Sequence, residues 1–321
     1  MESFAAVVAS GQPILLDGGL ATQLEARGHC LGDALWSARL LLEEPQEVRA
    51  AHEDFFAAGA EVAISASYQV SELGFAAAGR DRGAVQIALR RSIAVAREAA
   101  DSAVTGEGAT TAGSHHRWVA ASVGPYGAAL ADGSEYRGNY GLTVRELRAW
   151  HRPRLETLAE AGADVLALET IPRLAEVEAL LAEVERLRVP AWLSLTVAAP
   201  KEGSAAGSEA GAGSLPTTRL GEPLSQAYAM ADDVASVVAV GANCFDPDLV
   251  GGVATAARPF GKPILAYPNS GELWDASTRR WFGGRRISGV AARAWVEAGV
   301  QLIGGCCRVG PSIIASMRQA I

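Results

Sequence analysis

Eight short apolar runs alternate with longer segments of helical periodicity along the whole 321-residue sequence. This alternation is typical of βα units arranged around a parallel sheet. A chain of this length can form two ordinary domains or one large barrel, and eight strands with eight helices favour a single closed (β/α)8 barrel over an open sheet. The predicted strands are Pro13–Asp17, Glu61–Ser65, Trp118–Val123, Asp164–Glu169, Ala191–Val197, Ser236–Asn243, Pro263–Tyr267 and Val300–Gly304.

The segments between these strands carry apolar residues at three- and four-residue spacing, as helices with one buried face do. Three of the helical patterns end at Gly59, Gly162 or Gly299, just before the next strand. Glycine adopts the left-handed conformation that ends a helix without a Cβ penalty, so each is a predicted helix stop. The clearest helical segments are Pro45–Ala58, Ala84–Ala100, Val144–Glu160 and Leu174–Leu187.

One segment, Ala198–Leu220, breaks the pattern because it is rich in Gly, Ser and Ala. It has few side chains to bury, so it is expected to be flexible. A linker between two domains is the alternative interpretation. Because the βα alternation resumes after it, we expect an insertion at about residues 198–220 within one barrel domain that spans residues 1–321.

The composition excludes several classes of partner. Basic residues number 28 against 36 acidic ones, a net charge of −8, and no Lys/Arg run stands out. A surface that follows nucleic-acid phosphates is therefore not expected. No stretch approaches the roughly 20 apolar residues that span a bilayer, and the N-terminus lacks a basic region followed by an apolar one. These features predict a cytoplasmic protein without a membrane partner, and leave its oligomeric state open.

Three of the four cysteines follow predicted strands: Cys244 after the sixth, and Cys306 and Cys307 after the eighth. The carboxyl ends of barrel strands form the active-site face, so these thiols can converge. Soft sulfur ligands select zinc, and three of them leave a fourth tetrahedral position for a substrate. The alternative is that they are small buried apolar side chains. Cys30 lacks a strand-end position and is interpreted as structural or incidental.

Two carboxylates also stand at predicted strand ends, Asp17 and Glu169. There they could hold a substrate ammonium by charge-assisted hydrogen bonds. The adjacent Gly18 and Gly19 allow backbone N–H groups to approach a substrate carboxylate. Together these groups would bind an amino acid. Capping of the helices that follow is the alternative role for either carboxylate.

The turns that follow two other strands supply weaker ligand candidates. Ser122 precedes Gly124-Pro125, and Asn269 and Ser270 precede Gly271. Loop geometry explains the Gly and Pro residues. The polar atoms of Ser122, Asn269 and Ser270 remain candidates for substrate contact.

A series of short motifs runs along the chain in a specific order, although each is weak by itself. They are Asp17-Gly18-Gly19-Leu20-Ala21-Thr22, Leu35-Trp36-Ser37-Ala38, Ala66-Ser67-Tyr68-Gln69, Asp132–Gly138, His151-Arg152-Pro153-Arg154, Gly241-Ala242-Asn243-Cys244, Tyr267–Glu272 and Gly304-Gly305-Cys306-Cys307-Arg308. Taken together, over about Ile14 to Met317, these motifs resemble the zinc-dependent homocysteine S-methyltransferases. Within that family, the segment Asp132–Gly138 resembles the enzymes that use S-methylmethionine, rather than the betaine-dependent branch or the cobalamin-dependent methionine synthases.

The resemblance implies a (β/α)8 barrel that transfers a methyl group from S-methylmethionine, and more weakly from S-adenosylmethionine, to homocysteine, giving methionine. The zinc-bound homocysteine thiolate would be the nucleophile, and no protein nucleophile is expected. The implied ligands of one Zn²⁺ per chain are Cys244, Cys306 and Cys307. The implied substrate contacts are Asp17 and Glu169 at the homocysteine amine, backbone at Gly18 and Gly19, and the side chains of Ser67, Asn243 and Asn269.

Three other functions are weighed against this one. A betaine-type methyltransferase would use the same zinc site with an ammonium donor. A zinc-dependent barrel lyase or hydrolase would need an acid or base beside the metal, and three cysteine ligands make it less favoured. A structural zinc or redox module would normally close its site with a fourth protein ligand, and none is evident in the sequence.

Overall fold

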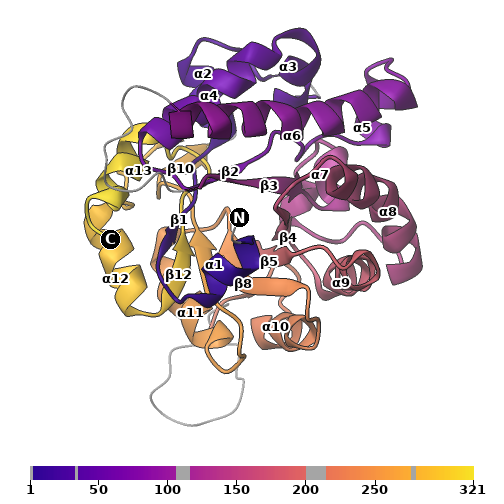
Figure 1. The fold of residues 1–321 in the computed structure, drawn as a ribbon. Helices are drawn as coiled ribbons and strands as arrows, with labels where there is room; N and C mark the ends of the chain where they lie inside the picture. Colours follow the sequence, from indigo (N-terminus) through magenta and orange to yellow (C-terminus); the bar gives the residue numbers. More distant parts are fainter. Residues whose placement is uncertain (1–2, 33–34, 106–115, 200–214, 276–279) are drawn as a thin grey trace.

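Eight parallel strands form a closed barrel in the computed structural model (Figure 1). Neighbouring strands follow the order β1-β12-β9-β8-β5-β4-β3-β2, and a parallel bridge between Leu16 and Val62 joins the two ends. The structure describes residues 3–32, 35–105, 116–199, 215–275 and 280–321. The barrel strands are β1 (Ile14–Leu15), β2 (Val62–Ile64), β3 (Trp118–Val123), β4 (Val165–Ile171), β5 (Ala191–Leu195), β8 (Val237–Asn243), β9 (Ile264–Tyr267) and β12 (Val300–Ile303). All eight predicted strands are confirmed.

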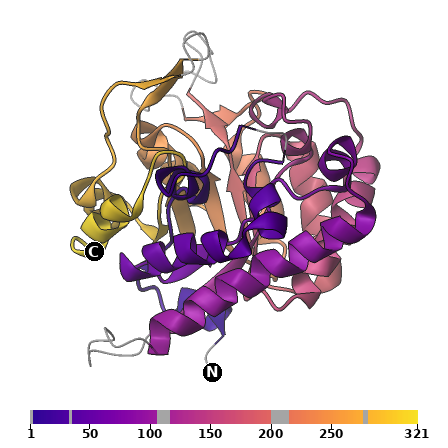
Figure 2. The same ribbon diagram turned by 90° about the horizontal axis from the view of Figure 1, so that it is seen from above.

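Helices surround the barrel, and the long helices α4 and α6 lie side by side across one flank (Figure 2). Local sequence sets their ends: Thr143 and Glu146 form a reciprocal capping box before α8, and Pro311 opens α13. The helices are α1 (Phe4–Ala9), α2 (Leu20–Ala26), α3 (Ser37–Glu43), α4 (Pro45–Ala57), α5 (Glu72–Ala77), α6 (Arg82–Thr105), α7 (Tyr126–Ala129), α8 (Val144–Glu160), α9 (Leu174–Leu187), α10 (Leu224–Asp232), α11 (Val250–Ala257), α12 (Gly289–Glu297) and α13 (Pro311–Arg318), with 3-10 turns at Ser134–Tyr136 and Pro247–Leu249.

The predicted glycine stops are confirmed, because Gly59, Gly162 and Gly299 have φ of 102°, 87° and 94°. A Cβ would be strained at such angles, so these helices end where the sequence requires it. Helix α6 is longer than its predicted range, and β4 continues two residues past Glu169.

Apolar side chains pack in two layers, one inside the barrel and one between the strands and the helices. Helix α1 contributes Phe4 to the inner layer. The centre of its ring lies 5.6 Å from that of Trp118, which it meets edge-on, and 6.1 Å from that of Trp192. Figure 1 shows α1 lying across the centre of the barrel. The side chains of α1 therefore fill the amino end of the barrel. A site is available at the opposite face, formed by the carboxyl ends of the strands.

Short antiparallel strands extend this carboxyl face. Strand β6 (Val197–Ala198) pairs with β7 (Thr217–Thr218), and β10 (Leu273–Asp275) pairs with β11 (Arg280–Phe282). The predicted insertion at residues 198–220 thus starts and ends in a two-stranded ribbon. Most of that predicted segment, residues 200–214, lies outside the residues that the structure describes, so its flexibility stays a prediction.

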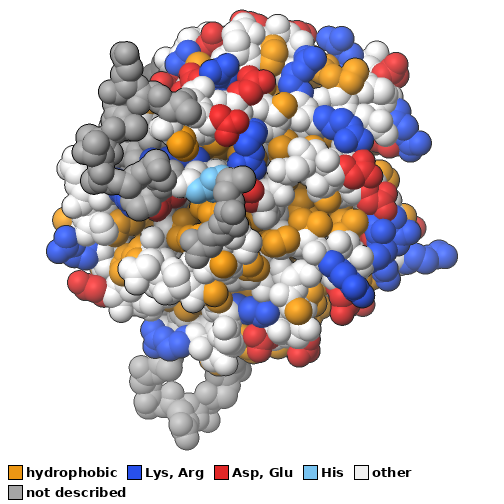
Figure 3. Space-filling view, viewed as in Figure 1, with side chains coloured by type: hydrophobic (Ala, Val, Ile, Leu, Met, Phe, Trp, Pro, Cys, Tyr) orange, Lys and Arg blue, Asp and Glu red, His pale blue; other side chains and the backbone are white. Residues whose placement is uncertain are grey.

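The surface agrees with the mixed charge of the sequence. Acidic and basic side chains are interspersed on the face shown in Figure 3. Among the described residues, no helix is both long and apolar enough to cross a membrane.

Candidate metal and substrate site

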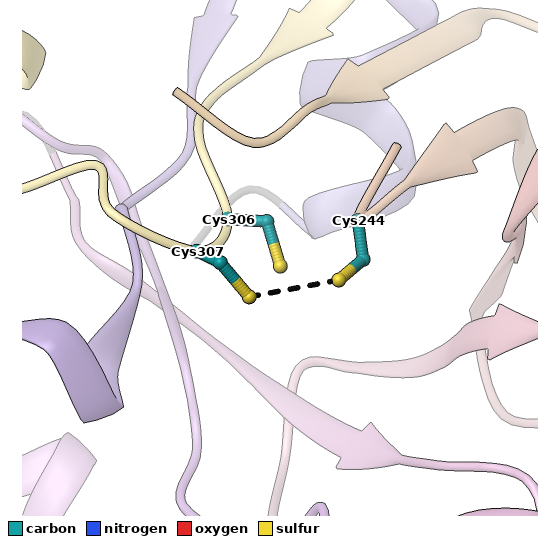
Figure 4. Close-up of side chains that lie close together, drawn as sticks. All are labelled: Cys244, Cys306 and Cys307. Carbon is teal, nitrogen blue, oxygen red and sulfur yellow. Dashed lines mark hydrogen bonds between the residues drawn. The ribbon is translucent and has the colours of Figure 1, made fainter. Parts of the chain in front are cut away.

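The three cysteines predicted to act together meet at the carboxyl face of the barrel. Cys244 follows β8 and Cys306 and Cys307 follow β12, with β9 between the two strands. Their sulfur atoms all lie within 4.8 Å of one another, and Cys244 Sγ is 3.6 Å from Cys307 Sγ (Figure 4). Tetrahedral zinc with Zn–S bonds of about 2.3 Å separates two sulfur ligands by about 3.8 Å. The donor set therefore fits a thiophilic metal ion, and it is the candidate metal site of this chain.

Hydrogen bonds from the cysteine backbones to the end of β9 and the loop after it hold both cysteine loops. The Cys244 N–H donates to Tyr267 O at 3.2 Å, and the Cys306 N–H donates to Pro268 O at 2.8 Å. The Cys307 N–H donates to Asn269 Oδ1 at 3.0 Å. Because these bonds come from one intervening strand end, the thiols are oriented before any ligand binds.

Backbone strain is concentrated in the same region. Thr170, Cys244 and Arg308 have φ of 60°, 54° and 66°, in the left-handed region that side-chain-bearing residues seldom adopt. Such conformations persist only where surrounding contacts enforce them, and they are common at active sites. At Cys244 the left-handed conformation ends β8, and the side chain lies beside the other two thiols.

The three thiols differ in their readiness to ionise. Hydrogen bonds from Cys306 and Cys307 hold the pKa of the Cys244 thiol well below its usual range. Hydrogen bonding to Cys244, with burial, raises the pKa of Cys306 and Cys307 well above theirs. These hydrogen bonds therefore favour the ionised form of Cys244, which is the least exposed of the three thiols.

The two predicted carboxylates are both buried beside this trio. Asp17 Oδ2 accepts the Ile64 N–H at 2.8 Å, while Asp17 Oδ1 is buried without a hydrogen-bond partner among the described residues. Glu169 accepts hydrogen bonds from the hydroxyls of Ser122 and Tyr267. Burial raises the pKa of Glu169 to about 7, and burial with the charge of Glu169 raises the pKa of Asp17 well above its usual range. Two such groups favour a cationic ligand between them.

The predicted amide contacts are engaged with the protein. Asn243 Oδ1 accepts the Thr170 N–H and the Ser194 hydroxyl, both at 2.7 Å, and Asn243 Nδ2 donates to Thr170 Oγ1 at 2.8 Å. Asn269 holds the Cys307 backbone. These bonds make both residues positioning groups for the neighbouring strand ends, and their direct contact with substrate stays a prediction.

The other predicted contacts lie at the β1 and β2 ends. The Ser67 hydroxyl donates to Ser122 O at 2.7 Å and lies 2.9 Å from Ser65 Oγ. A Cβ on Gly18 would come within 2.3 Å of Val309 O, and one on Gly19 within 2.5 Å of Cys306 O. Both positions therefore require glycine for close packing against the cysteine loop. The Gly19 N–H donates to Val309 O at 2.9 Å, so the Gly18 N–H is the better candidate for a substrate carboxylate.

Sequence reasoning missed three contributors to the site. The Tyr136 hydroxyl lies 3.1 Å from Cys244 Sγ, the Tyr267 hydroxyl donates to Glu169 Oε2 at 3.1 Å, and Thr170 is locked to Asn243. Tyr136 and Tyr267 stand within quoted motifs, and Thr170 directly follows the predicted strand-end residue Glu169, which are the signals that could have marked them. Their roles depend on contacts between distant loops.

An eight-stranded parallel barrel with three thiols and two buried carboxylates on its carboxyl face defines a barrel enzyme with a candidate metal site. The family model described as Homocysteine S-methyltransferase matches residues 14–321, and the chain belongs to this family.

Relatives and solved structures agree over nearly the full length. The chain is 42% identical to homocysteine S-methyltransferase 4 of Zea mays, covering 97% of this chain and 90% of that one. It is 41% identical to homocysteine S-methyltransferase of Escherichia coli (strain K12), covering 95% and 94%. The metallated form of the homocysteine methyltransferase MmuM from Escherichia coli superposes with a TM-score of 0.83 at 37% identity, covering 98% of this chain and 99% of that chain.

Proposed function

We propose that this chain transfers a methyl group from S-methylmethionine to the sulfur of homocysteine, so that both amino acids end as methionine. The observation that carries the proposal is the convergence of three sulfur atoms within 4.8 Å on the barrel face that also holds Asp17 and Glu169. This arrangement offers a thiophilic ion for a substrate thiol and buried carboxylates for a substrate amine.

The proposed metal is zinc, one ion per chain, with Cys244, Cys306 and Cys307 as its protein ligands. Bound zinc would supply a fourth position for the substrate thiol and lower its pKa, so that the sulfur is a thiolate at neutral pH. Three soft donors without a carboxylate or imidazole in the cluster support zinc over harder cations.

The remaining contacts would orient homocysteine. Asp17 Oδ1 and Glu169 would receive its ammonium group, because Asp17 Oδ1 is buried without a partner among the described residues and Glu169 is already aligned by Ser122 and Tyr267. The Gly18 N–H would lie near its carboxylate. Ser67, Asn243 and Asn269 complete the proposed contacts, chiefly by holding these strand ends.

The methyl transfer needs no nucleophile from the protein side chains. A lone pair of the homocysteine sulfur forms the new bond to the methyl carbon, and the old carbon–sulfur bond breaks with its electron pair returning to the donor sulfur. The thiol proton leaves to solvent. The task of the chain is to align the two sulfur atoms on either side of the methyl carbon.

Charge favours a sulfonium donor. The thiolate cluster carries negative charge, and transfer from S-methylmethionine to a thiolate removes the separated charges. That argument also admits the ammonium of betaine. The choice between the two rests on the segment Asp132–Gly138, whose Tyr136 reaches Cys244 in this structure.

Initial rates with homocysteine and a panel of donors test the proposal. At equal concentration, S-methylmethionine should give the fastest methionine formation, S-adenosylmethionine a slower rate, and betaine and methyltetrahydrofolate none. Faster turnover of betaine than of S-methylmethionine would overturn the donor assignment.

A further inference from the structure

Arg219 belongs to a closed circuit of contacts beside Cys244. Its Nη2 donates to Thr196 Oγ1 at 3.3 Å, and the Thr196 hydroxyl donates to Cys244 O at 3.4 Å. Its guanidinium carbon lies 5.5 Å from the centre of the Tyr136 ring, and the Tyr136 hydroxyl lies 3.1 Å from Cys244 Sγ. One tyrosine side chain therefore separates the arginine from the candidate metal site.

The backbone that carries Arg219 is fixed by a tight turn. The Thr218 N–H donates to Glu222 O at 2.9 Å, and the Gly221 N–H donates to Thr218 O at 2.9 Å. The carboxylate of Glu222 accepts the Thr218 hydroxyl at 2.7 Å and the Leu174 N–H, at the start of α9, at 3.0 Å. The turn is thus tied to the barrel wall, which holds the guanidinium in place before any ligand arrives.

The guanidinium is only partly satisfied. Among the described residues, Arg219 Nε is buried without a hydrogen-bond partner, and Arg219 makes no ion pair with an Asp or Glu. Burial lowers the pKa of Arg219, while the nearby charge of Cys244 opposes that shift. A partly buried arginine whose described partners are one hydroxyl and one aromatic ring loses hydration that these contacts replace only in part. Its planar fork matches a ligand carboxylate.

Arg219 lies across the barrel from two of the proposed homocysteine contacts. It follows β5 through the β6–β7 ribbon, whereas Asp17 and Gly18 follow β1. In the sheet order, β1 and β5 lie on opposite sides of the closed barrel. Glu169 and Cys244, at the ends of the neighbouring strands β4 and β8, mark where homocysteine would end on this side, and Arg219 with the Tyr136 ring beside it is left for the second substrate.

We propose that Arg219 binds the α-carboxylate of the amino-acid methyl donor, with the Tyr136 ring as the wall between that carboxylate and the sulfur cluster. The proposal rests on the proposed function, since it needs a donor that is itself an amino acid. S-methylmethionine carries its sulfonium and its carboxylate at opposite ends of a short carbon chain, which suits a site with a thiolate cluster at one end and a guanidinium at the other.

The test compares S-methylmethionine with its carboxamide, which lacks the negative charge. Arg219→Gln should raise KM for S-methylmethionine by roughly 10- to 150-fold, the usual loss for a charge-assisted hydrogen bond, and should weaken its binding by a similar factor in calorimetric titration. KM for the carboxamide should change by less than about 3-fold, and so should KM for homocysteine. Arg219→Lys keeps the positive charge but not the planar guanidinium. Its KM for S-methylmethionine should lie between those of the wild type and Arg219→Gln.

Arg90→Gln is the matched control, because Arg90 forms an exposed pair with Glu160 at 3.0 Å between α6 and α8. It should match the wild-type chain with both donors. Melting temperature and zinc content of each variant verify the fold. Equal losses for S-methylmethionine and its carboxamide, or a loss confined to homocysteine, would overturn the role of Arg219.

The two proposals fail differently. A wild-type chain that neither binds nor turns over S-methylmethionine overturns the proposed donor and, with it, the role of Arg219. A wild-type chain that does both, with an Arg219→Gln variant of equal affinity and KM, overturns the carboxylate contact alone.

Discussion

The side-chain oxygen of Asn269 accepts a 3.0 Å hydrogen bond from the backbone N–H of Cys307, and the Asn269 N–H donates to Phe245 O at 2.9 Å. Phe245 directly follows Cys244. Asn269, two residues after the end of β9, therefore ties together the two loops that carry the cysteines. Partners of this kind fix the orientation of metal ligands and contribute to metal affinity without touching the metal.

Asn269→Ala should weaken zinc binding by about 10- to 100-fold, because the Cys307 backbone loses the bond that orients it. Asn269→Asp keeps an acceptor oxygen at the same position and should lose less. Competition with a chelator of known affinity measures both. Unchanged zinc affinity in the alanine variant would show that the Cys307 loop holds its shape without this bond.

Replacing a cysteine of the cluster should remove the metal outright. We expect Cys306→Ser or Cys307→Ser to lose both bound zinc and methyl transfer, because two remaining thiols do not complete the proposed site. Cys30→Ser is the control, since Cys30 is exposed and lies outside the cluster. Elemental analysis of purified chains decides the matter, and full zinc occupancy in either cluster variant contradicts the assignment.

Glu169→Gln should raise KM for homocysteine while zinc stays bound. Losing one charge-assisted hydrogen bond costs about 1.5–3 kcal/mol, or roughly 10- to 150-fold in kcat/KM. Glu98→Gln, on the exposed side of α6, serves as the control because Glu98 forms an exposed pair with Arg49. If kcat/KM for homocysteine is the same in Glu169→Gln and wild type, Glu169 only supports the strand end.

The parts of this architecture that depend on local pattern could be predicted from the sequence. The eight strands follow from apolar runs, and the glycines at 59, 162 and 299 mark helix ends because glycine adopts their positive φ values without a Cβ penalty. The meeting of Cys244 with Cys306 and Cys307 follows from barrel geometry alone, since all three stand at strand ends on one face.

The contacts that depend on distant loops could not be predicted in this way. The approach of Tyr136 to Cys244 joins residues 108 positions apart through a 3-10 turn, and no periodicity encodes it. The left-handed φ of Thr170 is enforced by Asn243, 73 residues away, so local propensity gives no hint of it. Likewise, the engaged hydrogen bonds of Asn243 and Asn269 are visible only once the strands are paired.

Helix α4 carries a buried group whose effect on stability depends on pH. His52 is completely buried, and neither ring nitrogen has a hydrogen-bond partner among the described residues. Burial lowers the pKa of His52 to about 4, because the charged ring would lose its hydration without compensation. The packing of α4 against α6 accounts for this burial.

The folded chain should therefore lose stability as the pH falls from about 6.5 toward 4. In this pH window His52 takes up a proton in the unfolded state but not in the folded state. The free energy of unfolding therefore falls with pH, by up to about 3 kcal/mol near pH 4. His52→Leu removes this titration and keeps an apolar side chain in place. The measurement is the free energy of unfolding by denaturant at pH 7.5, 6, 5 and 4.5, taken as wild type minus variant, which cancels the buried His151 and the carboxyl groups common to both chains. The free energy of unfolding of the wild type should fall relative to that of His52→Leu at each step below about pH 6.5. A difference that does not change with pH would contradict a buried neutral His52.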